Sequence, residues 1–178
     1  LPVYTAALGP ATRRATGRMA DGWLPHNIPF PRLAEAFETV AETAREAGRD
    51  PESIRVTPYV PAAVSDDPED ARAAIRGHLA YYVGNGEGYR RAVEATFPDA
   101  EAIADAWAAG DRSRARDLVT AEMVDALGVA GTPETARERL ATLAEREVVD
   151  EPLVVVPDGV PQALKEQTVE ALAPENRT

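Results

Sequence analysis

The sequence contains no cysteine, which excludes disulfide bridges, a thiolate nucleophile and cysteine-ligated metal centres. Its two histidines, His26 and His78, lie far apart in the chain and make no metal-binding signature, so we expect no metal site. No apolar run approaches the roughly 20 residues that a membrane-spanning helix needs. A signal-peptide pattern is also lacking. We therefore expect a cytoplasmic protein with no membrane contact.

Positive charge is scarce, with 19 Lys and Arg against 30 Asp and Glu and a formal net charge of −11. Nucleic-acid binding needs a basic face, so this balance argues against a nucleic-acid partner. Lys165 is the single lysine, and the other basic residues are arginines. An acidic, Ala- and Arg-rich, Lys-poor chain is typical of a salt-loving archaeon with GC-rich coding. A mildly acidic protein from any GC-rich bacterium is the alternative.

The first 25 residues predict a strand, a helix and a second strand. Residues 2–8 are apolar and partly β-branched, as in a buried strand. Gly9 and Pro10 end this strand, and residues 11–20 have helical character before a second strand over 23–25. Such a βαβ unit is expected to be right-handed with parallel strands.

The turn Leu8-Gly9-Pro10-Ala11-Thr12 is the strongest candidate site. In parallel α/β structures, ligands collect at the carboxyl ends of strands, where N–H groups at a helix start hold anions. Gly9 lets a ligand approach the main chain, Pro10 suits the first helical turn, and Thr12 adds a hydroxyl. The alternative is a plain turn in which glycine and proline only make the corner.

The rest of the chain alternates predicted helices with predicted strands, and no internal repeat or linker divides it. Prolines at 58 and 61 fit poorly inside a central strand, which puts the length of the third strand in question. Residues 89–126 predict three short helices, an insertion over about 85–125. Longer helices are predicted over 33–47, 68–82, 133–146 and 161–172, and further strands over 54–64 and 152–156.

Two segments resemble a known family. The strand ending in Ala-Ala-Leu-Gly-Pro, its helix, and Ala20-Asp21-Gly22-Trp23 resemble the fifth and sixth βα units of the luciferase-like monooxygenase superfamily. Within it, the chain is similar to the coenzyme F420-dependent oxidoreductases of the methylenetetrahydromethanopterin reductase type. Residues 123–134, which contain Gly-Thr-Pro, resemble the family's run into its last large helix.

The resemblance implies an α/β fold, the C-terminal half of a TIM (β/α)8 barrel with about four parallel strands. A complete barrel takes roughly 250 residues, whereas this chain has 178 and opens on Leu1 directly into a strand with mid-barrel counterparts. We therefore expect a fragment that forms a single luciferase-like domain over 1–178.

The resemblance also implies a function, an oxidoreductase that transfers a hydride between a reduced deazaflavin and a small organic substrate. The cofactor would be coenzyme F420, with FMN as the alternative. The main chain would hold it near its phosphate-bearing side chain, through Ala7, Leu8, Gly9, Pro10, Ala11 and Thr12. The catalytic residues remain unknown, because the earlier strands supply much of the ring-facing surface.

His26 and Asn27 follow the second strand and would lie on the ligand-facing rim of a barrel. There they could hydrogen-bond a substrate or the cofactor; the alternative is a polar loop without a role. His78 falls on the apolar stripe of a helix, which predicts a half-buried histidine with satisfied hydrogen bonds. The glycines between 84 and 88 follow a helix, unlike a dinucleotide fingerprint, and predict a flexible hinge.

An open four-stranded parallel sheet would leave two strand edges unpaired, and such edges invite pairing. We expect the chain to pair with a missing N-terminal half or to form a homo-oligomer. The alternative function is a truncated, non-catalytic half-barrel that acts as a binding or assembly module.

Overall fold

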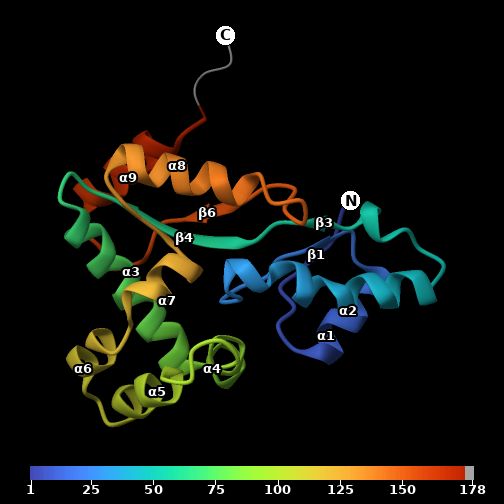
Figure 1. Ribbon diagram of the computed structural model, residues 1–178, viewed down its shortest axis with the longest axis horizontal. Helices are drawn as coiled ribbons and strands as arrows, with labels where there is room; N and C mark the ends of the chain where they lie inside the picture. Colours follow the sequence, from blue (N-terminus) through green and yellow to red (C-terminus); the bar gives the residue numbers. More distant parts are fainter. Residues whose placement is uncertain (175–178) are drawn as a thin grey trace.

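The computed structural model describes residues 1–174, and its strands lie in two short parallel sheets (Figure 1). The first sheet has the order β1-β2-β3 and the second the order β5-β4-β6. Every strand pairing is parallel, as the sequence predicts for an α/β fold. The strands are β1 (Tyr4–Thr5), β2 (Gly22–Trp23), β3 (Arg55–Val56), β4 (Tyr59–Val64), β5 (Val129–Gly131) and β6 (Leu153–Val155).

The predicted strand over 54–64 is interrupted, because Thr57 and Pro58 separate β3 from β4. Proline has no N–H to donate to a neighbouring strand. The backbone beside it stays paired, since the N–H of Thr57 donates to the carbonyl of Trp23 and that of Tyr59 to Pro25, both at 2.9 Å. Figure 1 shows β3 leading directly into β4, so one nearly continuous path connects the two sheets.

β5 was not predicted. It pairs with the carboxyl end of β4, with Val129 opposite Ala62 and Gly131 opposite Val64. Three residues are too few to show the alternation that indicates a strand in a sequence. Gly131 has a φ of 149°, a conformation that side chains rarely adopt, so glycine is required where β5 turns into the next helix.

The five longer helices agree with the predicted ranges to within a few residues, except at the end of the third. That helix passes through Gly84 and ends at Asn85, so the predicted break between helices lies at Gly86 and not at Gly84. A Cβ on Gly84 would lie 2.1 Å from the Trp107 ring, which shows that this glycine serves close packing. These helices are α1 (Pro10–Met19), α2 (Leu33–Glu46), α3 (Pro68–Asn85), α8 (Pro133–Ala144) and α9 (Gln162–Leu172).

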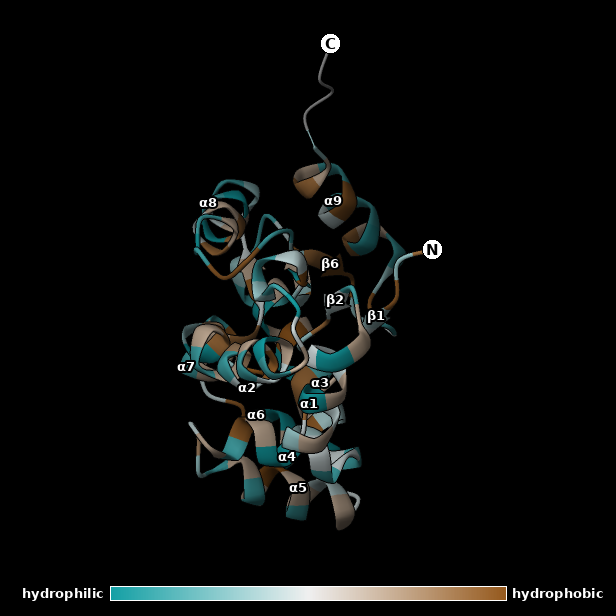
Figure 2. Ribbon diagram, turned by 90° about the vertical axis from the view of Figure 1, so that its right-hand side faces the viewer, coloured by the Kyte–Doolittle hydropathy of each residue, from teal (hydrophilic) through white to brown (hydrophobic). Residues whose placement is uncertain are grey.

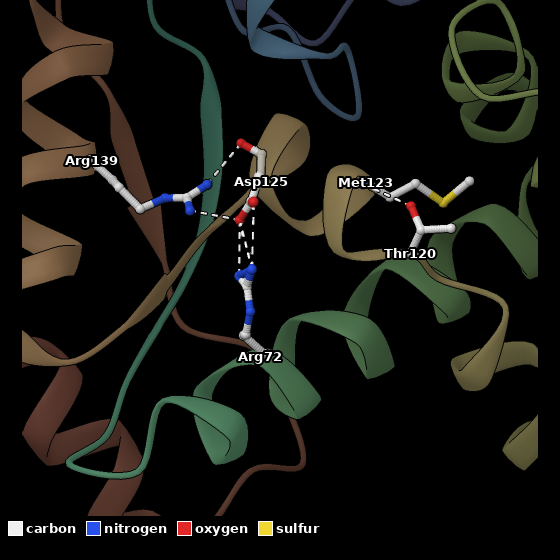
Figure 3. Close-up of polar contacts among 5 residues, drawn as sticks. All are labelled: Arg72, Thr120, Met123, Asp125 and Arg139. Atoms are coloured by element: carbon white, nitrogen blue, oxygen red, sulfur yellow. Dashed lines mark hydrogen bonds and ion pairs between the residues drawn. The ribbon is translucent and has the colours of Figure 1, made fainter.

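Four short helices, rather than three, follow α3. The additional helix is capped by Thr120, whose hydroxyl accepts a hydrogen bond from the N–H of Met123 at 3.2 Å (Figure 3). In Figure 1 these helices lie on the opposite side of β4 from α8 and α9. They are α4 (Glu87–Glu94), α5 (Ala100–Ala108), α6 (Arg112–Asp117) and α7 (Ala121–Leu127).

Two apolar clusters form the core. The first packs the strands against α2 and α8, with Trp23, Val40 and Leu143 among its buried members. The second packs α3 against the short helices, around Ile75 and Ile103. In Figure 2 the strand β6 is brown between mixed teal and brown helices, consistent with a hydrophobic strand under amphipathic helices.

Asp125 connects three helices that come from distant parts of the chain (Figure 3). Its Oδ1 lies 2.9 Å from Nη1 of Arg72 on α3 and 2.6 Å from Nη1 of Arg139 on α8. Nη2 of Arg139 also donates to the Asp125 carbonyl at 3.0 Å. These contacts tie the short helices to α8, although partly exposed ion pairs contribute only modestly to stability.

Within residues 1–174, no helix combines the length and the apolar character that crossing a membrane would require.

Candidate functional site

A hydrogen bond from β2 holds the turn between β1 and α1 in place. Ala7 is buried, and its carbonyl accepts a hydrogen bond from the indole Nε1 of Trp23 at 2.8 Å. Trp23 is itself fully buried in β2, so its ring fixes the turn against the sheet. Gly9 is the N-cap of α1 and Pro10 its first residue, as the sequence predicts.

Gly9 presents bare main chain on the surface of the turn. Its φ of −83° and ψ of 160° are extended values that any residue adopts. A Cβ added there would meet no heavy atom of the described chain within 4 Å, neighbours in sequence aside. Neither backbone conformation nor packing therefore requires glycine, which leaves close approach by another molecule as a physical reason for it.

Thr12 lies one turn into α1, where its hydroxyl donates to the carbonyl of Gly9 at 2.9 Å. The hydroxyl hydrogen is thus engaged within the helix, while the oxygen keeps lone pairs free to accept a bond. No side chain in the described range caps the N-terminus of α1. The N–H groups of its first turn therefore remain available to an anion.

A pocket of about 480 Å³ opens beside this turn. Leu8, Gly9 and Pro10 line it, whereas Ala7, Ala11 and Thr12 do not. Its other walls come from the loop after β2, from α2 and from α4, so elements distant in sequence assemble it. The remaining lining residues are Arg13, Ile28, Pro29, Arg32, Glu35, Ala36, Thr39, Gly88, Arg91, Ala92, Ala95 and Thr96.

Three arginines and one glutamate line this pocket, which leaves two net positive charges in a chain of net charge −11. Arg32 pairs with Glu35 at 2.6 Å, and Arg91 pairs with Glu87 on α4. Arginine guanidinium groups bind carboxylates and phosphates through charge-assisted hydrogen bonds. The pocket can therefore hold an anionic group.

Arg13 is the arginine closest in sequence to the turn, and it forms no ion pair with any described residue. Its Nη1 donates to the carbonyl of Ala36 at 3.4 Å, and its Nε is buried without a partner in the described range. Burial lowers the pKa of its guanidinium group. Sequence reasoning missed all three arginines; one signal for Arg13 was its place one turn after Gly-Pro.

His26 and Asn27 follow β2, but both are buried, at 8% and 5% exposure. The His26 ring stacks on Tyr59 with centroids 3.9 Å apart, and Tyr82 and Tyr89 lie within 4.8 Å. Burial, and secondly the neighbouring His78, lower the pKa of His26 to about 4. His26 is thus neutral at pH 7 and can donate or accept a hydrogen bond.

Asn27 has a φ of 54°, in the left-handed region that few side chains other than Asn and Asp tolerate. Both polar atoms of its amide, and Nε2 of His26, are buried without partners among the described residues. Such unpaired buried groups are costly and therefore mark a candidate binding site. Neither residue lines the pocket beside the turn.

His78 is half-buried, as predicted, but its hydrogen bonds are not satisfied. Its Nε2 has no partner within residues 1–174. Burial lowers its pKa to about 4, although Asp158 acts in the opposite direction. No group of three or more metal-ligating side chains occurs in the described part of the chain.

The fold agrees with the comparison to known families. The model of the luciferase-like monooxygenase family matches residues 1–150. The chain belongs to this family, as the resemblance in its sequence indicates.

Among curated relatives, 5,10-methylenetetrahydromethanopterin reductase of Methanopyrus kandleri is 32% identical over 145 residues, covering 80% of this chain and 41% of the relative. The reductase of Methanolobus tindarius is 30% identical over 148 residues, covering 82% of this chain and 45% of the relative. The chain thus spans less than half the length of these relatives.

The fold is similar to that of the coenzyme F420 dependent tetrahydromethanopterin reductase from Methanopyrus kandleri. The TM-score is 0.76 at 26% identity, with 97% of this chain and 49% of the other covered. An F420-dependent secondary alcohol dehydrogenase shares the fold at a TM-score of 0.64 and 17% identity, over 98% of this chain and 49% of that one.

Proposed function

We propose that this chain is part of an oxidoreductase that transfers a hydride between reduced coenzyme F420 and a small organic substrate. One observation carries the proposal: the unhindered main chain at Gly9 adjoins a pocket with two net positive charges in an acidic chain. Coenzyme F420 carries an anionic, phosphate-bearing side chain, which such a pocket suits. The relatives named above use this cofactor or act on a tetrahydropterin.

The residues present suit the cofactor. Open space at Gly9 would admit its side chain to the turn formed by Ala7, Leu8, Gly9, Pro10, Ala11 and Thr12. Arg13 would bind an anionic oxygen of the cofactor. The N–H groups at the start of α1 would add to the positive electrostatic potential at that oxygen. When bound, the deazaflavin supplies the hydride chemistry, while the protein supplies binding and orientation.

FMN is the alternative cofactor, because it also carries a phosphate that this pocket would attract. His26 and Asn27 are proposed to hydrogen-bond the substrate or the ring, which the unpaired buried atoms of both residues support. We assign no catalytic residue.

We further propose that the chain is the C-terminal half of a TIM (β/α)8 barrel, in a single cytoplasmic domain with α4 to α7 as its helical insertion. The strands β1 and β6 form outer edges of their sheets. Val3, just before β1, and Leu153, in β6, expose apolar side chains. Pairing with an N-terminal half, or with a second copy, would cover these edges.

The same exposed edges favour a second candidate function, a non-catalytic half-barrel that serves as a binding or assembly module. The two candidates differ in cofactor binding, since only the first requires that the turn and its arginines hold an anionic ligand.

The deciding experiment is a titration of the full-length protein with F420 and, separately, with FMN, followed by quenching of cofactor fluorescence. We expect saturable binding of F420 at least tenfold tighter than binding of FMN. Tighter binding of FMN would identify FMN, rather than F420, as the cofactor. Binding of neither would favour the assembly module.

A further inference from the structure

Seven aromatic rings form one connected cluster around α3. This helix carries three of them, and β4, α4 and α5, which Figure 1 shows around it, carry one each. The seventh ring comes from the loop after β2. The aromatic cluster consists of His26, Tyr59, His78, Tyr81, Tyr82, Tyr89 and Trp107.

Packing alone does not explain this choice of side chains. The aromatic cluster holds four of the chain's five tyrosines but none of its three phenylalanines, all of which lie in the described range. A phenylalanine ring would fill the same space without a hydroxyl group that is costly to bury. A phenol differs from a phenyl ring in its chemistry, because it readily gives up one electron together with its proton.

The tyrosines of the aromatic cluster form a path of neighbouring rings. Tyr59 stacks on His26 with centroids 3.9 Å apart, and His26 meets Tyr82 at 4.4 Å. Tyr59 and Tyr82 are themselves 6.4 Å apart, and Tyr82 meets Tyr81 edge to face at 5.3 Å. Electron transfer slows steeply with distance, so an electron passes between such neighbours in short steps far faster than across the whole cluster.

The two ends of this path differ in their environment. Tyr59 is partly buried, and burial, followed by the neighbouring Tyr82, raises the pKa of its phenol. It therefore keeps its proton at pH 7 and must lose proton and electron together. Nε2 of His26 has no partner among the described residues, so this ring can accept the phenol proton in transit. Tyr81, by contrast, is 52% exposed and can release its proton to water.

Trp107 lies beyond Tyr81, at 5.7 Å, but its ring is covered by a cation. The guanidinium carbon of Arg112 lies 3.7 Å from the centroid of the Trp107 ring. Oxidation by one electron would place a positive charge on this ring, which the guanidinium group repels. The path therefore ends at Tyr81, with Trp107 packed against it.

We propose that the aromatic cluster is a radical-transfer route, which carries an oxidising radical from Tyr59 through Tyr82 to the protein surface at Tyr81. The oxidant is a peroxyl radical, which takes one electron and one proton from the Tyr59 hydroxyl and becomes a hydroperoxide. Tyr82 then returns an electron and a proton to Tyr59, and Tyr81 does the same for Tyr82. A soluble thiol or ascorbate finally donates an electron and a proton to Tyr81, which restores the protein.

Such a route protects the buried part of the protein from oxidative damage. The inference goes beyond the proposed function and does not depend on F420 binding at the turn.

The test starts the radical at the Tyr59 end. A ruthenium polypyridyl complex is attached to the full-length protein through Asp158→Cys, because Asp158 is exposed and its charge acts on Tyr59. These 178 residues contain no other cysteine, and any cysteine elsewhere in the protein is replaced by serine. A light flash with an external quencher produces ruthenium(III), which removes one electron. Transient absorption follows the phenoxyl radical, and a nitroso spin trap with mass spectrometry identifies the residue that carries it.

We expect the trapped radical on Tyr81 in the parent protein. Tyr82→Phe keeps the ring but removes the phenol, and should slow radical formation at Tyr81 at least tenfold. Tyr4→Phe, outside the aromatic cluster, should leave the rate unchanged. Arg112→Ala should move part of the radical to Trp107, because the repelling cation is gone.

Direct oxidation of Tyr81 by the complex would not respond to Tyr82→Phe. The proposal is overturned if the parent protein forms no phenoxyl radical or keeps it on Tyr59. It is also overturned if a folded Tyr82→Phe variant forms the Tyr81 radical as fast as the parent. Should Tyr82→Phe not fold, Tyr81→Phe replaces it, and the radical must then stay on Tyr82; its appearance elsewhere overturns the route.

Discussion

His26 shows how strongly a few neighbours set the chemistry of one residue. Its ring is enclosed by Tyr59, Tyr82 and Tyr89, and its Nε2 has no partner among the described residues. Charging this ring would place a cation in an apolar, poorly solvated environment. The folded protein therefore favours the neutral imidazole, as it does for His78 nearby.

These two histidines predict a pH dependence of stability. Their pKa values of about 4 in the folded protein lie below 6.5, the ordinary value for the unfolded chain. Between these values the unfolded state binds more protons, so the free energy of unfolding should fall as the pH decreases from 6.5 towards 4. Above pH 6.5 this contribution is fully present. We expect a loss of about 2 kcal/mol per histidine by pH 5.

Urea unfolding between pH 7 and 5 measures this loss, in a range where most carboxylates have not yet titrated. His26→Phe keeps an apolar ring without a titrating nitrogen and should remove about half of the decline. An equal decline in the parent and in His26→Phe would contradict the assignment.

For single residues, the sequence predicts those features of the candidate site that depend on neighbouring residues in the chain. Leu8, Gly9 and Pro10 can be recognised because a strand end, a turn and a helix start follow one another directly. Arg32 and Arg91 could not be predicted, because they reach the same pocket from the turn before α2 and from α4. The tyrosines around His26 likewise come from β4, α3 and α4.

Among elements, α1 and α2 are held in unusually close contact by a glycine. A Cβ on Gly17 would lie 2.4 Å from the carbonyl oxygen of Val40 and 3.0 Å from Cβ of Thr43. Both neighbours belong to α2, and the first is backbone that cannot rotate away. The missing side chain therefore sets the distance between the two helices.

We predict that Gly17→Ala destabilises the protein by about 1–3 kcal/mol, the usual cost of overpacking a tight interior contact. Gly9→Ala is the matched control, because its Cβ meets no described atom within 4 Å. The control should change the free energy of unfolding by less than about 0.5 kcal/mol. Chemical denaturation measures the free energy of unfolding of both variants. Equal values would show that α1 and α2 can move apart to accommodate the added methyl group without loss of stability.

Elements with long periodic patterns were predictable, and those set by tertiary contacts were not. α2, α3 and α8 carry apolar residues at helical spacing, so their positions follow from the sequence. β5 depends on its pairing with β4, and three residues carry too little pattern to reveal it. The helix α7 was merged with its neighbours because its start depends on a single cap at Thr120.

For the whole molecule, the net charge of −11 is the dominant electrostatic feature. Repulsion among carboxylates opposes the compact state, and salt screens it over a distance of about 10 Å at 0.1 M. We predict that the melting temperature rises by several degrees between dilute buffer and molar potassium chloride. Differential scanning calorimetry measures this rise, and a flat melting temperature would remove the argument for salt adaptation.

The exposed strand edges give a second prediction at this scale. Expressed alone, the 178-residue chain should self-associate or bind the dye ANS, because β1 and β6 leave edges and apolar side chains uncovered. Analytical ultracentrifugation at low and high salt detects association. A stable monomer that binds no ANS would show that these edges need no partner.

The central claim is that the turn from Ala7 to Thr12 holds the cofactor, and Gly9→Val tests it most directly. Valine tolerates the extended backbone at this position, and its Cβ meets no described atom. The variant should therefore fold normally while its side chain blocks the approach of a ligand. Thr12→Val, which removes the hydroxyl at nearly constant size, should weaken binding by about 1–3 kcal/mol if that oxygen contacts an anionic group.

The measurement is the dissociation constant for F420, beside the melting temperature, in the full-length protein and its variants. Arg55→Ala is the control, because this exposed residue lies at the amino end of β3, away from the ligand-facing ends of the strands. We predict at least tenfold weaker binding for Gly9→Val, with unchanged melting temperature and unchanged affinity for Arg55→Ala. A folded Gly9→Val protein that binds F420 as tightly as the parent would contradict the account.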